Sequence, residues 1–234
     1  MSALLGVPAG AAYHLVSTLA AVLAPLAGSL APAAAIVAFT VAVRLILVPL
    51  SYRAMKGMDA QARIAPKVRA LRKQHAGRSE AFQRALAALY RSEGASVFAG
   101  CLPVLVQWPF LSVMYLVFRS RVIDGVRNTL LGHDLFGAPL GSYWLSAGPF
   151  SAHGAVFAVL FLLLAGIGWI SARNTRALTA TAGPAAVSKL IPYLTVAFAA
   201  ILPLASGLYL ATTTAWTVAE RQLMRRFANR GTGR

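Results

Sequence analysis

Acidic residues and cysteines are scarce in this sequence, and their scarcity excludes several kinds of function. The 234 residues contain one cysteine, Cys101, so no disulfide can form within the chain. One cysteine and four scattered histidines offer no spacing suited to a metal site. There are six Asp and Glu residues, and none lies in the middle of a long apolar run. We therefore expect no metal, no redox chemistry and no cofactor.

Enzyme motifs are missing as well. The sequence has no His-Glu-x-x-His, no Gly-x-Ser-x-Gly and no P-loop. We expect the protein not to be an enzyme, nor a pump with a nucleotide site of its own.

The sequence is instead rich in apolar residues. Hydrophobic residues make up 58% and charged residues 12%, whereas a soluble domain is about half apolar and about one quarter charged. Five apolar runs approach the roughly 20 residues that cross a bilayer, and backbone groups in lipid must bond within a helix when no barrel strands are present. The sequence predicts an all-α polytopic membrane protein with spans at about 33–52, 97–118, 153–171, 188–204 and 206–223. The last two spans would be separated by a tight turn at 205–207.

The positive charges predict how the chain is oriented. Residues 1–43 carry no Lys or Arg, whereas 53–91 carry ten and 221–234 carry five. Because basic loops stay on the cytoplasmic side, we expect the N-terminus outside, the segment 53–96 inside, and a short basic tail, 225–234, also in the cytoplasm.

The first 32 residues allow two interpretations. Residues 11–30 are largely apolar, but Pro25, Gly28 and Pro32 interrupt them and no charge flanks them. We expect residues 1–32 to be an extracytoplasmic segment with an amphipathic helix on the outer membrane surface. If that helix spanned the bilayer instead, the chain would have six spans and the N-terminus would lie inside.

Residues 53–96 predict a cytoplasmic helical hairpin. Apolar residues recur at helical spacing in two stretches, which are separated by 75–77, and Ser79 is expected to cap the second helix. The basic surface of this hairpin suits anionic lipid headgroups, and charge alone leaves open a contact with ribosomal RNA. Sequence-specific binding of nucleic acid is not expected.

Arg44 is the most informative single residue, because it lies inside the first predicted span. A boundary near Tyr52 places it about 12 Å deep, where a charge costs at least about 2.5–3.5 kcal/mol. We expect it to face a hydrated cavity open to the cytoplasm, and among the acids only Glu220 could reach it. Further polar groups for this cavity are Thr40, Gln107, Ser206, Thr212, Thr213 and Thr214. Alternatively, Arg44 snorkels to the interface and the uncharged groups only bond between helices.

Five short strings resemble the YidC/Oxa/Alb family of membrane protein insertases. In order along the chain they are Val43–Leu50, Ile64–Lys67, Ala87–Arg91, Gly100–Phe110 and Ser206–Leu210. The resemblance extends from about Ala33 to Met224 and is strongest to the short members of Gram-positive or actinobacterial type. It implies a five-helix core at 33–224, the hairpin at 53–96, and a groove open to cytoplasm and lipid.

The resemblance also implies residues and partners. Arg44, Thr40, Gln107 and Thr212 would line the groove, and Met55, Met58, Pro66 and Tyr90 would be contact residues of the hairpin. The protein would insert newly made proteins into the bacterial inner membrane and help them fold, alone or with the Sec translocon, and it could meet the ribosome. The alternatives are a transporter or channel for a small solute and a structural accessory of the translocon.

Overall fold

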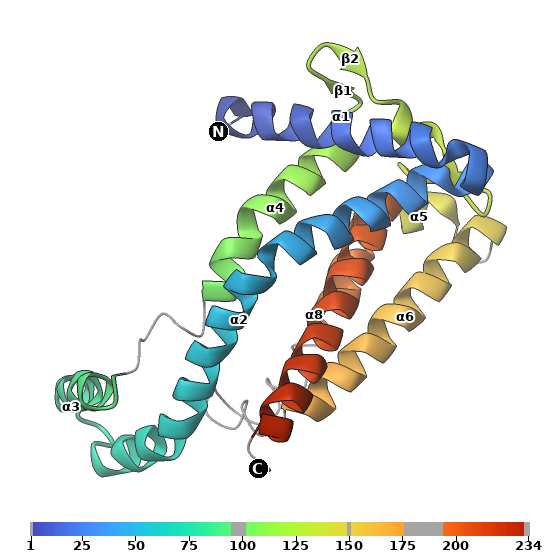
Figure 1. Ribbon diagram of the computed structural model, residues 1–234. Helices are drawn as coiled ribbons and strands as arrows, with labels where there is room; N and C mark the ends of the chain where they lie inside the picture. The colour runs from blue at the N-terminus through green and yellow to red at the C-terminus, as the bar shows by residue number, and fades with distance from the viewer. Residues whose placement is uncertain (1, 95–101, 149–150, 176–193, 232–234) are drawn as a thin grey trace.

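The computed structural model describes residues 2–94, 102–148, 151–175 and 194–231. This part of the chain is mostly helical, which confirms the all-α prediction. In Figure 1, helices α2, α4, α6 and α8 run roughly along one another, and α1 lies across one end of them. The long helices are α2 (Ala31–Gln74), α4 (Leu102–Arg119), α6 (Ala152–Thr175) and α8 (Leu204–Gly231).

Helix α1 (Ser2–Ala27) is the segment with two interpretations. It buries Tyr13, Val16 and Ala20 against the rest of the molecule, and the Tyr13 hydroxyl donates to the backbone oxygen of Arg127 at 3.3 Å. A short 3-10 turn, η1 (Gly28–Leu30), then joins α1 to α2, and its Gly28 has a positive φ of 53° that a residue with a side chain rarely adopts. The position of α1 relative to a membrane stays a prediction.

Helix α2 joins two segments that the sequence analysis treated separately. It runs without a break for 44 residues, through Pro49 and Pro66. The predicted boundary at residue 53 is therefore not a boundary of secondary structure. Figure 1 shows α2 changing direction along its length, as expected where a proline removes a backbone hydrogen bond.

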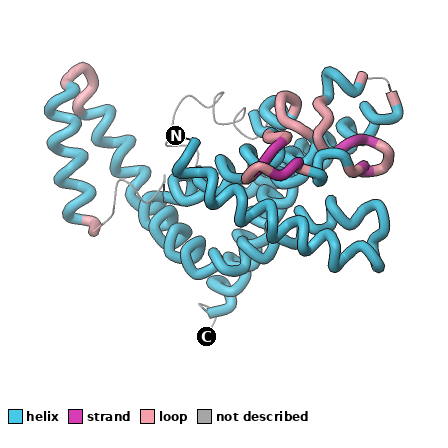
Figure 2. Tube along the Cα trace, turned by 90° about the horizontal axis from the view of Figure 1, so that it is seen from above, coloured by secondary structure: helices cyan, strands magenta, loops and turns pink. Residues whose placement is uncertain are grey.

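Helix α3 (Ser79–Ser92) lies beside the end of α2, and Figure 2 shows the two set apart from the other helices. Gly77, in the turn between α2 and α3, has a φ of 81°, and the side chains of Lys67 and Glu93 form an ion pair between the two segments. The prediction that Ser79 caps α3 is wrong. Arg78 occupies the capping position without a side-chain hydrogen bond, and Ser79 is the first helical residue.

Two small hairpins lie between α4 and α6, and the sequence analysis did not predict them. They pair β1 (Val122–Ile123) with β2 (Val126–Arg127), and β3 (Asp134–Leu135) with β4 (Ala138–Pro139). The 3-10 turn η3 (Thr129–Gly132) separates them, and the short helix α5 (Trp144–Ala147) follows.

Asn128 fixes this connection to the end of α4. Its buried amide donates to the backbone oxygens of Val117 and Ser120, at 2.7 and 3.0 Å, and its own oxygen accepts from the backbone of Leu130. The oxygens at the end of a helix lack partners within that helix, so Asn128 supplies the missing donors.

The turn before the last helix lies earlier than predicted. Helix α8 begins at Leu204, so the residues 205–207 proposed as a turn belong to its first turn. The backbone N–H groups of Leu204 and Ala205 donate to the carbonyl oxygens of Ser142 and Leu140, both at 2.9 Å. Helix α8 then continues to Gly231, so the start of the predicted 225–234 tail is helical.

The buried core lies where α1, the connection 120–148, the end of α4 and the starts of α2, α6 and α8 meet. Its fully buried side chains include Val16, Ile36, Phe118, Phe157 and Leu204. Within the described ranges, two helical stretches are long and apolar enough to cross a bilayer, Gly6–Gly57 and Ala152–Arg173. The count of five spans and the side on which the 53–96 segment lies stay predictions.

Candidate functional site

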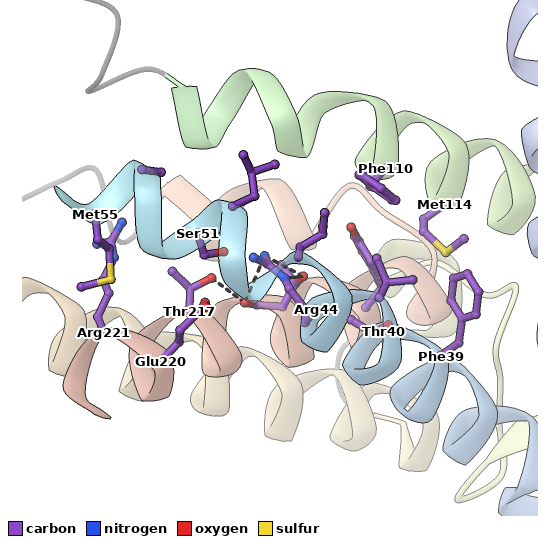
Figure 3. A pocket seen from close by; sticks show the side chains of 16 residues that line it. Phe39, Thr40, Arg44, Ser51, Met55, Phe110, Met114, Thr217, Glu220 and Arg221 are labelled. Atoms are coloured by element: carbon purple, nitrogen blue, oxygen red, sulfur yellow. Dashed lines mark hydrogen bonds between the residues drawn. The ribbon is translucent and has the colours of Figure 1, made fainter. Parts of the chain in front are cut away.

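A pocket opens between α2, α4 and α8, and we call it the Arg44 pocket. It encloses about 900 Å³ of space, part of it open to solvent. Phe110 and Met114 of α4 form an apolar wall of the pocket. Polar side chains of α2 and α8 line the rest of it and lie near one another (Figure 3).

Helical spacing aligns the polar side chains of the Arg44 pocket. On α2, Thr40, Arg44 and Ser51 follow one another at intervals of four and seven residues. On α8, Tyr209, Thr213 and Thr217 are four residues apart, and all six line the pocket. Residues three, four or seven apart share one face of a helix, so each helix presents one polar stripe to the other.

The two stripes are joined by Arg44 and Thr213. The guanidinium Nε and Nη2 donate to Thr213 Oγ1 at 3.0 and 2.9 Å, and Nη2 also lies 3.4 Å from the Thr213 carbonyl oxygen. Thr213 is only 2% exposed. These hydrogen bonds hold the guanidinium against α8. This geometry favours the cavity interpretation of Arg44 over a snorkelling side chain.

Two other hydroxyls of the stripes, those of Thr40 and Thr217, bond along their own helices. Thr40 donates to the backbone oxygen of Ile36 at 2.6 Å, and Thr217 donates to that of Thr213 at 2.8 Å. A threonine bonded in this way has used its proton but keeps a lone pair that can accept. The pocket therefore combines the bonded guanidinium of Arg44 with acceptor oxygens and an apolar wall.

The structure brings together some of the residues predicted for the groove and not others. Thr40 and Arg44 line the pocket, whereas Thr212 does not. The Thr212 hydroxyl donates to the backbone oxygen of Leu208 at 2.9 Å. Thr213 takes the place expected for Thr212. The side chain of Gln107 lies outside the described residues.

The four residues proposed for the hairpin are dispersed. Met55 lines the end of the Arg44 pocket. Pro66 is exposed further along α2, and Tyr90 lies half-buried on α3. Neither lines the pocket, and the side chain of Met58 lies outside the described residues.

Glu220 is part of the pocket, although the sequence analysis treated it only as an acid that could reach Arg44. It lines the pocket together with Ser51, Thr217 and Arg221. Its Oε1 atom is shielded from solvent and accepts no hydrogen bond from any residue that the structure describes. The spacing of seven residues from Thr213 was the available signal, since it places both on one face of α8.

Comparisons with known proteins point to one family. A family model described as "60Kd inner membrane protein" matches residues 23–231. Similar curated proteins carry the name "Membrane protein insertase YidC". The one from Acidiphilium cryptum is 41% identical over 105 residues, which are 43% of this chain and 17% of that protein. The one from Helicobacter pylori strain J99 is 35% identical over 102 residues, 43% of this chain and 19% of that protein. The matched segments therefore span less than a fifth of these relatives.

Proposed function

Since the chain belongs to the 60Kd inner membrane protein family, as the resemblance of its motifs predicted, we propose that it inserts newly made proteins into the membrane. The observation that carries this proposal is the position of Arg44, whose guanidinium is bonded to Thr213 in a pocket that is apolar on one side and partly open to solvent. No covalent step is required. The pocket would lower the barrier for a polar flank of the substrate to enter the bilayer.

In the proposed mechanism, the pocket receives the polar flank of the substrate and lipid receives its apolar helix. Arg44 attracts an acidic residue of the segment being moved, and this attraction is stronger in the pocket than in water because the effective dielectric constant is lower. The Thr40 and Thr217 hydroxyl oxygens and the solvent in the open pocket replace part of the segment's hydration. The apolar helix of the substrate then moves into lipid, where burial contributes about 25 cal/mol per Å².

We also propose that the protein lies in the bacterial inner membrane, with its N-terminus outside and its C-terminus in the cytoplasm. The distribution of Lys and Arg supports this orientation. The outward face of α6 supports burial in lipid, because Val159, Leu162 and Leu163 are all more than half exposed. The proposed partners are nascent membrane proteins and lipid, with the Sec translocon and the ribosome as further partners through the basic segment 53–96.

Site-specific photocrosslinking tests this proposal. A photoreactive amino acid is placed at Val43, which lines the Arg44 pocket, and in a matched control at Leu162, which is exposed on α6. We expect stalled nascent chains of a single-span protein to crosslink at Val43 and much less at Leu162. Adducts at Val43 with translocon subunits alone would support the accessory role instead.

A further inference from the structure

Glu220 is the acidic residue of the Arg44 pocket, and the proposed insertion step gives it no role. The structure describes all six acidic residues of the sequence, and of these only Glu220 lines the pocket. Arg44 and Arg221 are basic residues of the same lining. An anion beside two cations changes how strongly the pocket attracts a further anion.

Glu220 acts on the same guanidinium that Thr213 holds. The Arg44 guanidinium donates to Thr213, and Glu220 follows Thr213 by seven residues on the same face of α8. The charges of Arg44 and Glu220 interact with each other inside the pocket, where Figure 3 shows both side chains. The positive charge proposed to attract substrates therefore already has an anion near it.

Neighbouring side chains stabilise the Glu220 carboxylate in this place. One of its oxygens is shielded from solvent, and a carboxylate out of water needs donors or cations nearby. Ser51 on α2 and Trp216 on α8 supply hydrogen-bonding groups, and Arg44 and Arg221 supply positive charge. The pocket thus contains a carboxylate of its own beside the arginine to which substrate carboxylates would bind.

An acidic residue of a substrate would compete with Glu220 for Arg44. Two carboxylates near one guanidinium repel each other, so the substrate is held less strongly than it would be without Glu220. When the substrate leaves, Arg44 keeps an anion near it. This matters for insertion, because a segment that was held too strongly in the pocket could not move on into the membrane.

We propose that Glu220 is a positioning residue that acts through Arg44 and limits how strongly the pocket holds acidic segments. It is the internal counter-ion of Arg44 in the empty pocket, and it opposes the acidic residue of a bound substrate. This inference rests on the proposed insertase function. It adds to that function a reason why an acidic tail is attracted to the pocket but not retained there.

Photocrosslinking from Val43, which lines the pocket, tests this limit. The substrates are stalled single-span chains whose tails differ only in one Asp or Asn, and the ratio of Asp-tail to Asn-tail adducts reports the hold on an acidic residue. Glu220→Gln should raise this ratio roughly two- to fivefold, the size of a partly screened ion pair. Glu220→Asp, which keeps the charge, should raise it less. In the Arg44→Ala background, Glu220→Gln should change the ratio much less.

Glu80→Gln is the matched control, because it removes the same charge from an exposed position on α3, and it should keep the wild-type ratio. An unchanged or lower ratio in Glu220→Gln would overturn the inference, as would an equal rise with and without Arg44. An equal loss of both adducts would also overturn it, because Glu220 would then only support the structure of the pocket. Adducts with neither chain in the wild-type protein would instead refute the proposed function itself.

Discussion

The guanidinium of Arg44 on α2 donates two hydrogen bonds to the hydroxyl of Thr213 on α8, 169 positions along the chain. This contact joins the two helices that carry the polar stripes of the pocket. It also fixes the direction of a charged side chain that has four flexible torsions. The orientation of the positive charge therefore depends on a neutral residue of another helix.

Replacing Thr213 by valine should destabilise the protein by about 1.5–3 kcal/mol, since it removes the acceptor of two hydrogen bonds from a charged donor in a buried place. The matched control is Thr212→Val, whose hydroxyl bonds only within its own helix and whose loss should cost less than about 1 kcal/mol. Unfolding in mixed micelles of SDS and a mild detergent measures both. Equal destabilisation by the two variants would show that Arg44 does not depend on Thr213.

Close packing of α6 against α8 at Gly207 gives a second prediction. A Cβ atom at this position would lie 2.6 Å from Cδ2 at the end of the Leu160 side chain, so Leu160 must shift and Gly207→Ala should destabilise by about 1 kcal/mol. Gly166→Ala on α6 is the control, because nothing lies within 4 Å of its Cβ, and it should be neutral or stabilising by up to about 1 kcal/mol. If the clash is the cause, adding Leu160→Ala to Gly207→Ala should cost less than the sum of the two single changes.

The amide of Asn128 gives a third prediction. Asn128→Ala leaves the carbonyl oxygens of Val117 and Ser120 without these donors, and we expect a loss of about 2–4 kcal/mol. Asn128→Asp keeps the acceptor for Leu130 but not the two donated bonds, so it should also destabilise. Limited proteolysis of the 120–148 connection should become faster in both variants. Unchanged proteolysis and stability would contradict the role given to this side chain.

The sequence was sufficient to predict the helical class and that Arg44 faces other polar groups. Long apolar runs can satisfy their backbone groups only as helices, and a charge inside one of them must face something polar. It was not sufficient to choose between Thr212 and Thr213. Neighbouring helical residues point about 100° apart, and which of them faces α2 depends on the rotation of α8, which packing such as that of Gly207 on Leu160 determines.

The helix boundaries near residues 53 and 205 differ from the sequence prediction for local reasons. The change to a charged composition suggested a boundary near residue 53, yet α2 continues because its hydrogen bonds resume after Pro49 and Pro66. The small residues 205–207 suggested a turn, but the carbonyl groups of Leu140 and Ser142 accept from the first amides of α8. Bonds between distant segments of this kind leave no periodic signal in the sequence.

Insertion by the purified protein is the most direct test of the central claim that the charge of Arg44 serves membrane insertion. A small single-span substrate with an acidic tail is added to proteoliposomes that contain wild-type protein, Arg44→Ala, Arg44→Lys, or the control Arg63→Ala, which removes an exposed arginine outside the pocket. We expect wild type and Arg63→Ala to insert well above empty liposomes and Arg44→Lys to keep part of this activity. Arg44→Ala should insert roughly fivefold less, from the loss of about 1 kcal/mol of charge attraction. Equal insertion by wild type and Arg44→Ala, for acidic and neutral tails alike, would contradict the account.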